Sequence, residues 1–329
     1  MRPPDFWQNK PDRPGFIAAI LSPLAFIYAS ATAYRVQRAP AIKPDVPVIC
    51  IGNLNIGGTG KTPTVIALIE LLSNRNVHVV TRGYGGSEVG PLHVNEKNHT
   101  ADEVGDEPLL LAAFSTTCVS KDRAAGVRAA QNAGAEVILL DDGFQNPDVA
   151  KSLNLVVVDA ARGFGNGKVI PAGPLRETIH AGLSRADLLL SIGNLEEQEK
   201  FDQLWGHQIT VPRVRAETKP LQTGMDWQGQ RVLAFAGIGQ PEKFFQTLRS
   251  LGANIVKSVP LDDHQPLSDT LLNRLQADAT ALSAQLVTTE KDAVRLPTGY
   301  RRNVLALPVR LKFTQRSELD IQLNRLDLT

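Results

Sequence analysis

The sequence has few cysteines and almost no net charge, and each shortage excludes a class of protein. Its 329 residues include only Cys50 and Cys118, far apart in apolar runs, which excludes a disulfide framework and predicts buried thiols in a reducing compartment. No group of Cys and His residues has zinc-ligand spacing. The 35 basic and 34 acidic residues give a net charge of +1, so no nucleic-acid partner is expected.

The N-terminus departs from this balance. Residues 16–34, FIAAILSPLAFIYASATAY, contain no charged side chain, and the first 43 residues carry a net charge of +4. The basic residues there are Arg2, Lys10, Arg13, Arg35, Arg38 and Lys43. We predict a helix on the membrane surface, whose basic flanks bind anionic head groups. Its apolar stripe comprises Ile17, Ile20, Leu21, Leu24 and Tyr28.

Three alternatives remain open for this segment. A membrane-spanning helix needs about 20 apolar residues, and this stretch is marginal, rich in Ala and Ser, and interrupted by Pro23. The run ASATA resembles a signal-peptide end, but the later stretch NIGGTGKT, residues 55–62, is typical of ATP-binding loops, and export would separate it from ATP. The third alternative is a helix packed on its own domain.

From Val46 onward, apolar β-branched runs alternate with helical stretches. Strands are predicted over residues 46–51, 77–81, 116–120, 136–140, 155–159 and 187–192, and helices over 63–72, 107–114 and 123–133. Continuous apolar strands that alternate with helices indicate a parallel sheet covered on both faces. The predicted fold class is α/β, with a doubly wound, mainly parallel sheet.

A second, smaller α/β domain is predicted from residue 214. Its expected strands are 231–236, 254–259, 284–288 and 303–308, its expected helix is 271–281, and residues 209–229 are expected to form a linker and hinge. The predicted organisation is therefore an N-terminal membrane-associated segment (1–40), a core domain (41–213) and a C-terminal domain (214–329). Ligands of open α/β sheets bind beyond the carboxyl ends of strands, so the active site is expected in the cleft between the two domains.

Residues 55–62, NIGGTGKT, nearly match the phosphate-binding loop G-x-x-x-x-G-K-[ST] between a predicted strand and a predicted helix. The predicted ATP site is Asn55, Ile56, Gly57, Gly58, Thr59, Gly60, Lys61 and Thr62. Its glycines let backbone N–H groups converge on phosphate oxygens at a helix N-terminus. Lys61 would reach the β- and γ-phosphates and Thr62 would ligate Mg²⁺. The core is therefore predicted to be P-loop NTPase-like.

A second motif, EVILLDDGFQN, is an apolar strand that ends in Asp141 and Asp142. This is the Walker B arrangement, in which one carboxylate holds Mg²⁺ and the other orients the metal or the nucleophile. Which aspartate has which role stays open. The alternative is that one of them only caps the next helix.

Three further segments place polar side chains at the expected cleft. The Gly- and Pro-rich loop 161–177 ends in Arg176 and Glu177, candidates for phosphate and Mg²⁺ contacts or solvated charges of a rigid loop. Asp106 is expected at the start of a helix, where it acts either as a catalytic base or only as a helix cap. His264, in LDDHQP, is a candidate base or base partner, although a lone His is often incidental.

With these motifs in this order, the chain resembles the tetraacyldisaccharide 4'-kinases, the lipid A 4'-kinases of Gram-negative bacteria. The matching stretches are GNLNIGGTGKTP, TRGYGG, GDEPLLLA, DDGFQN, VVVDAARGFGNGKVIPAGPLRE, FAGIGQPEKFF and TTEKDAVRL. Each is weak alone, but the ordered set is specific and spans both domains. The N-terminal apolar segment also matches the family's membrane-associated helix.

The resemblance implies transfer of the γ-phosphate of ATP to the 4'-hydroxyl of a tetraacylated glucosamine disaccharide 1-phosphate, at the cytoplasmic face of the bacterial inner membrane. It implies that Asp106 is the catalytic base and His264 its partner, and that Asp141, Asp142 and Glu177 lie near the metal. Arg82 and Arg123 are predicted contacts for the 1-phosphate. No obligate protein partner is inferred.

The sequence departs from the family pattern at two positions. Asn146 stands where many members have a histidine, and Gln265 follows His264 where many have a second histidine. Only His264 is therefore available as the partner of the base.

Two rival functions are weighed against the kinase. A membrane-associated regulatory NTPase of the MinD type would carry an extra lysine early in the loop, and the Asn55-Ile56 region has none. A soluble small-molecule kinase or ligase would keep its activity without residues 1–35, whereas a lipid kinase is expected to lose membrane binding and turnover.

Overall fold

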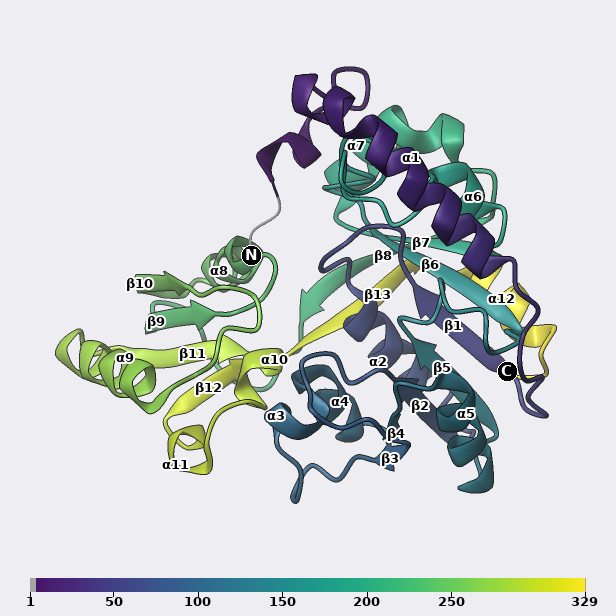
Figure 1. The fold of residues 1–329 in the computed structure, drawn as a ribbon. Helices are drawn as coiled ribbons and strands as arrows, with labels where there is room; N and C mark the ends of the chain where they lie inside the picture. The colour runs from purple at the N-terminus through teal and green to yellow at the C-terminus, as the bar shows by residue number, and fades with distance from the viewer. Residues whose placement is uncertain (1–3, 329) are drawn as a thin grey trace.

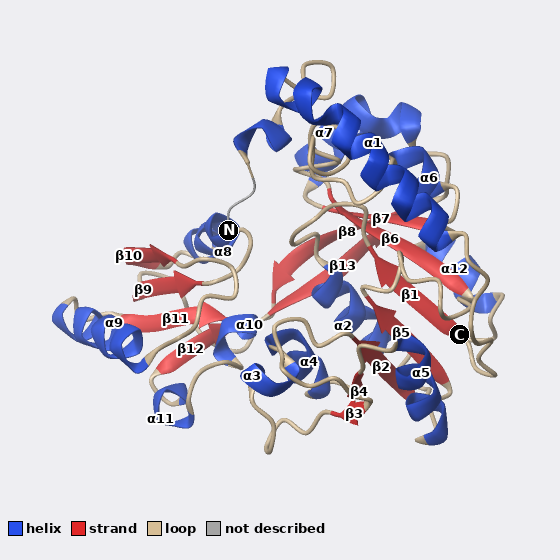
Figure 2. Cartoon of the chain, in the orientation of Figure 1, coloured by secondary structure: helices blue, strands red, loops and turns tan. Residues whose placement is uncertain are grey.

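The computed structural model describes residues 4–328, and Arg2 lies outside this range. Two sheets organise the chain, one of nine strands and one of four. Figure 1 shows the two sheets in separate parts of the molecule, with the C-terminal end of the chain returning to the larger one. Figure 2 shows that helices flank both sheets. The predicted α/β class with a second, smaller α/β domain is confirmed.

The large sheet has the order β13-β8-β7-β6-β1-β5-β2-β4-β3. Its strands are β1 (Val48–Gly52), β2 (Val77–Thr81), β3 (Leu92–His93), β4 (Thr116–Val119), β5 (Val137–Asp141), β6 (Leu153–Asp159), β7 (Leu188–Ile192), β8 (Arg213–Pro220) and β13 (Val309–Gln315). All neighbours pair in parallel except β3 with β4 and β13 with β8, at the two edges. The central strands are buried along their whole length, which explains their unbroken apolar sequences.

Helices cover both faces of this sheet. One face packs against α2 (Lys61–Leu71), α4 (Asp106–Ala112) and α12 (Ser317–Asn324). The other packs against α1 (Phe16–Val36), α5 (Arg123–Asn132), α6 (Ile179–Leu183) and α7 (Leu195–Trp205). The short helix α3 (Ala101–Val104) and the 3-10 turns η1 (Asp5–Gln8) and η2 (Gly206–Gln208) lie in connections. The strands and helices thus form a doubly wound, three-layer core.

The small domain has a parallel sheet of order β10-β9-β11-β12. Its strands are β9 (Arg231–Ala236), β10 (Asn254–Pro260), β11 (Gln285–Thr289) and β12 (Val304–Leu307). Helix α8 (Pro241–Ser250) packs on one face and α9 (Asp269–Ala281) on the other, each with its own apolar cluster. The short helices α10 (Glu290–Ala293) and α11 (Thr298–Arg301) connect β11 to β12.

The division of the chain differs from the one predicted at residue 214. Strand β8 occupies much of the expected linker and pairs with β7, and the late strand β13 pairs with β8. The small domain is therefore an insertion between β8 and β13, and α12 packs back on the core. Residues 213–220 are not apolar throughout, because β8 lies near the sheet edge; buried Val214 and Ala216 alternate with half-buried residues, and the rest of the strand is not buried.

Helix α1 lies along the outside of the core beside α6 and α7 (Figure 1). It packs on the core through the buried Ala18 and Ala25 and the half-buried Leu21 and Ala29, so Leu21 does not belong to the predicted outward stripe. Most of its other large apolar side chains face outward; Phe16 is 80% exposed and Phe26 is 74% exposed. By length and composition this 21-residue helix could cross a membrane. One of its faces packs on the core, as the alternative of a helix packed on its own domain predicts.

Candidate functional site

The phosphate-binding loop connects β1 to α2, as predicted. Gly57 and Gly60 have φ values of 102° and 94°, a backbone conformation that side-chain-bearing residues rarely adopt. A Cβ atom on Gly57 or Gly58 would meet nothing within 4 Å, so this part of the loop lies open toward a ligand. Helix α2 begins at Lys61, which places the loop's amides at a helix N-terminus, where phosphates bind.

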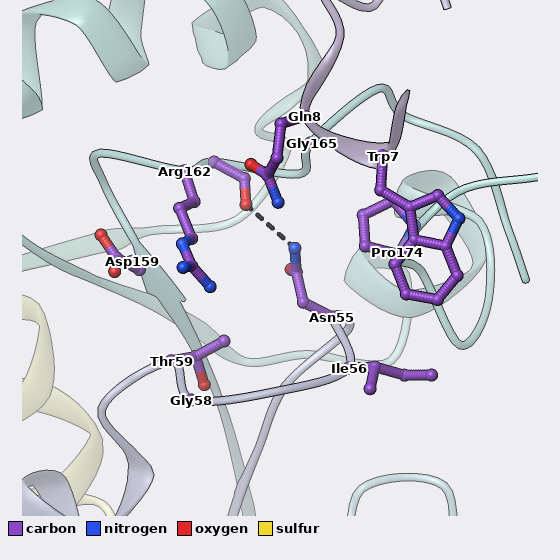
Figure 3. A pocket seen from close by; sticks show the side chains of 11 residues that line it. Trp7, Gln8, Asn55, Ile56, Gly58, Thr59, Asp159, Arg162, Gly165 and Pro174 are labelled. Carbon is purple, nitrogen blue, oxygen red and sulfur yellow. Dashed lines mark hydrogen bonds between the residues drawn. The ribbon is translucent and has the colours of Figure 1, made fainter. Parts of the chain in front are cut away.

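Asn55 has a structural reason to replace the first glycine. Its side-chain amide donates a hydrogen bond of 3.1 Å to the carbonyl of Gly163 (Figure 3). Its backbone forms an antiparallel bridge with Leu175, and the next amide, of Ile56, donates to the carbonyl of Pro174 at 2.8 Å. The Gly- and Pro-rich loop 161–177 therefore fixes the first turn of the phosphate-binding loop.

The two predicted Walker B aspartates lie at the end of β5, beside the loop. Asp142 is within 3.5 Å of both Lys61 Nζ and an Arg176 nitrogen. Asp141 is buried, and one of its oxygens accepts a hydrogen bond of 3.2 Å from the Thr81 hydroxyl. Burial, together with the nearby Glu107 carboxylate, raises the pKa of Asp141 to about 7. For Asp142 burial acts in the same direction, but Lys61 and Arg176 outweigh it and lower the pKa.

Asp106 and His264 meet across the two domains. Asp106 opens α4 and is 3% exposed, and His264 follows β10 with a φ of 57°. The distance from His264 Nδ1 to Asp106 Oδ2 is 3.0 Å. This contact raises the pKa of His264 although burial opposes it. Burial would raise the pKa of Asp106, but His264 and two further cations together lower it.

Those two cations are Lys291 and Arg295, which sequence analysis did not assign. Lys291 Nζ lies 4.0 Å and Arg295 Nε 3.8 Å from Asp106 Oδ2. Lys291 also pairs with Glu107 at 3.1 Å. Both residues belong to the stretch TTEKDAVRL, which matches the family. This match marked the stretch, but it did not indicate what Lys291 and Arg295 do.

The small domain also reaches the phosphate-binding loop directly. Lys243 Nζ lies 2.8 Å from Asp159 at the end of β6, and Gln240 donates a hydrogen bond of 2.7 Å to the same carboxylate. A Cβ atom on Gly239 would lie 3.7 Å from the Gly58 amide nitrogen. The segment 239–243 therefore lies close to the phosphate-binding loop and to the end of β6.

A cavity of about 340 Å³ opens on the other side of Asp142. Its basic lining residues are Arg35, Arg38, Arg82, Lys121, Arg123 and Arg176. Arg35 belongs to the last turn of α1 and Arg38 follows it, so the end of this helix borders the cavity. Arg123 is itself buried and donates to the carbonyl of Asp141 at 3.1 Å, so it also positions that residue.

Two other predicted residues have structural partners. The buried Glu177 carboxylate pairs with Arg185 and accepts a hydrogen bond of 3.0 Å from Gln145. Gln145 also donates to the carbonyl of Asn53 at 2.9 Å, which ties Glu177 to the end of β1. Asn146 donates to Asp148 at 2.8 Å and shapes the turn after β5.

The family model described as "Tetraacyldisaccharide-1-P 4'-kinase" matches residues 17–326 of this chain. The chain belongs to this family. A tetraacyldisaccharide 4'-kinase of Dinoroseobacter shibae is 60% identical over 99% of this chain and 98% of its own length. One from a Jannaschia species is 55% identical over 99% of both chains. The crystal structure of LpxK from Aquifex aeolicus in complex with ATP superimposes with a TM-score of 0.78 at 28% identity, over 94% of this chain and 99% of that one.

Three side chains beside the phosphate-binding loop carry oxygen atoms of the kind that binds Mg²⁺. Oδ1 of Asp141 is buried and has no hydrogen-bond donor among residues 4–328, and Oδ1 of Asp142 is buried and faces Lys61 Nζ at 3.5 Å. Thr62 follows Lys61 at the start of α2. Hard oxygen donors of this kind suit Mg²⁺, so these three residues fit the ion. Within the same described range, no group of three or more His, Cys, Asp and Glu side chains forms a metal cage by itself.

Proposed function

We propose that this protein transfers the γ-phosphate of ATP to the 4'-hydroxyl of a tetraacylated glucosamine disaccharide 1-phosphate. The observation that carries the proposal is that the small domain approaches the phosphate-binding loop through Gly239 and contacts Asp106 through His264. Glu107, the neighbour of Asp106, lies close enough to Asp141 to raise its pKa, which links the base to the Walker B strand. Membership of the tetraacyldisaccharide-1-P 4'-kinase family supports the substrate class.

The protein's own contribution is positioning and neutralisation of charge. The amides of residues 57–62 bind the phosphates of ATP, and Lys61 stabilises the charge on the transferred group. Asp106 accepts the proton of the sugar hydroxyl, and its buried Oδ2 lies 3.0 Å from Nδ1 of His264, with Lys291 and Arg295 also nearby. His264 orients the Asp106 carboxylate and stabilises its charge.

Thr62, Asp141 and Asp142 would hold Mg²⁺, which when bound neutralises phosphate charge. Lys61 and Arg176 then have a second function, because they keep Asp142 ionised and aligned before the ion binds. We assign Glu177 a supporting role in place of the predicted metal contact, because Gln145 and Arg185 engage both of its oxygens. Through Gln145 it holds the end of β1, from which the loop departs.

The basic cavity is the proposed place of the substrate's 1-phosphate. Six Lys and Arg side chains surround it against two acidic ones, Asp142 and Asp148. Arg35 and Arg38 extend the cavity toward α1, whose outward side chains would lie in the membrane surface with the acyl chains. The protein would thus act as a peripheral or monotopic enzyme at the cytoplasmic face of the inner membrane, where ATP is present.

The test is incubation of the purified protein with γ-labelled ATP and tetraacyldisaccharide 1-phosphate in mixed micelles. Label should appear in a lipid with a second phosphomonoester, and Lys61→Met should abolish the transfer. Release of labelled inorganic phosphate without any labelled lipid would overturn the proposal and favour a regulatory NTPase.

A further inference from the structure

The segment that precedes α1 is docked against the rim of the nucleotide site. Residues Asp5–Gln8 form a 3-10 turn, and α1 begins eight residues later at Phe16. Trp7 and Gln8 line a cavity of about 20 Å³ together with Asn55, Ile56 and Gly58 of the phosphate-binding loop. Figure 3 shows Trp7 beside Pro174 and Gln8 near Asn55 in this corner.

Three hydrogen bonds fasten the turn to the loop 161–177. The Trp7 indole N–H donates to the carbonyl of Pro171 at 3.1 Å, and the Trp7 carbonyl accepts from the amide of Asn166 at 2.9 Å. The Asn166 side chain donates to the carbonyl of Phe6 at 3.2 Å and to that of Ala172 at 2.9 Å. Asn166 is 1% exposed, so this junction is a buried and specific contact.

The same loop holds the first turn of the phosphate-binding loop. Gly163 accepts the hydrogen bond of Asn55, and Pro174 accepts that of Ile56. A continuous chain of contacts therefore runs from Trp7 through residues 163–174 to the loop that binds phosphate. The approach is close, since a Cβ atom on Gly165 would lie 2.5 Å from the Trp7 carbonyl oxygen.

We propose that Trp7 is a positioning residue for the nucleotide site, which holds residues 55–56 in their ATP-binding conformation through the loop 163–174. The proposal rests on ATP being the phosphate donor. The two ends of the phosphate-binding loop are held by different parts of the protein. Gly60 directly precedes α2, whereas Asn55 and Ile56 are hydrogen-bonded to the loop 163–174, which Trp7 contacts. The segment that leads into the apolar helix thereby contributes to ATP binding.

The experiment measures the Kd of MgATP by calorimetry on full-length Trp7→Ala, Trp7→Phe and Asn166→Ala. We expect Trp7→Ala to weaken ATP binding about tenfold, the scale of one lost anchoring interaction. Trp7→Phe keeps a ring but loses the donor to Pro171, and should have an intermediate effect. Because Trp7 and Asn166 act on the same contact, the double variant Trp7→Ala/Asn166→Ala should lose less than the sum of the single effects.

The matched control is Phe16→Ala, an aromatic truncation at an exposed position of α1. It should leave the Kd of MgATP unchanged and raise the KM for the lipid, whereas Trp7→Phe should raise the KM for ATP and leave the lipid KM within about twofold. Wild-type ATP affinity in folded Trp7→Ala and Trp7→Phe would overturn the proposal. If Trp7→Ala does not fold, Trp7→Phe alone decides. Wild-type protein that binds ATP but labels no lipid would instead refute the proposed function.

Discussion

The imidazole of His264, from the small domain, lies with Nδ1 3.0 Å from Oδ2 of Asp106, from the core. Lys291 Nζ and Arg295 Nε, also from the small domain, lie 4.0 Å and 3.8 Å from the same oxygen. The proposed base therefore belongs to one domain and the groups that tune its pKa belong to the other. Separation of the domains would leave the buried carboxylate without its cationic neighbours.

The first prediction concerns pH. His264 and the two cations lower the pKa of Asp106 against the effect of burial. In His264→Gln the pKa of Asp106 should rise, so the acid limb of the kcat/KM profile should move to higher pH. The profile should be measured with saturating Mg²⁺ throughout. An acid limb at the same pH in both proteins would show that Asp106 is not the titrating group.

The same pair has opposite effects on stability at the two ends of the pH range. The pKa of Asp106 is lowered in the fold, so its contribution is present above the unfolded pKa and is lost as pH falls through the folded value. The pKa of His264 is raised, so its contribution is present below the unfolded pKa and is lost as pH rises through the folded value. Thermal melting of wild type and His264→Gln should therefore differ most in mildly acidic buffer and converge at alkaline pH.

The second prediction concerns catalysis by Asp106. Asp106→Asn should lower kcat by about 10²- to 10⁴-fold, because a positioned general base contributes on that scale. The Kd of ATP should change little, since Asp106 lies outside the phosphate-binding loop. Asp102→Asn, on the neighbouring short helix α3 and exposed, is the matched control and should retain full kcat. Comparable kcat in Asp106→Asn and the control would remove Asp106 from the mechanism.

The third prediction concerns the bridge between Lys243 and Asp159 over the phosphate-binding loop. Lys243 is 44% exposed, so water screens the pair and its contribution to stability should be small, about 0–1 kcal/mol. The pair should instead help to hold the small domain against the core. Its loss should therefore raise the KM for ATP in both Lys243→Met and Asp159→Asn. A double-mutant cycle on that KM should show coupling. Strictly additive effects would mean that the two side chains do not act together.

The fourth prediction separates the two faces of α1. Ala18→Leu adds volume at a fully buried position and should destabilise the fold by about 1–3 kcal/mol, seen as a lower Tm. Ile20→Ser changes a side chain that is 60% exposed and should leave the Tm nearly unchanged, while it weakens flotation with anionic vesicles. A lower Tm in Ile20→Ser and unchanged vesicle binding would contradict the assignment of the outward face to the membrane.

Local patterns predicted most elements of the fold. Unbroken apolar runs identified the buried parallel strands. The glycines and lysine of residues 55–62 come directly after one of these runs, so the loop was correctly placed between a strand and a helix. Asp142 lies beside Lys61 of the phosphate-binding loop, and Asp106 contacts His264 between the domains. The elements are visible in the sequence because their burial and periodicity are local properties.

Contacts between residues far apart in the chain could not be predicted from the sequence. Strand β13 pairs with β8 across the whole small domain, and no local pattern specifies which edge a strand will join. Lys291 contacts Glu107 from 184 positions away, so its place beside Asp106 depends on how the domains pack. Trp7 was also missed, because its partners are backbone carbonyls and amides of a loop whose conformation composition cannot reveal.

The insertion of the small domain has a consequence for biosynthesis. Pro220 and Val309 are register partners, so the chain leaves the large sheet and re-enters it at adjacent positions. A ribosome must therefore complete all of the residues between them before it can supply β13 and α12, whose Leu319 and Leu323 belong to the main apolar core. Synthesis of the core therefore begins before and ends after that of the small domain, so a nascent chain that has emerged only as far as residue 308 would hold a complete small domain beside an open edge of the large sheet.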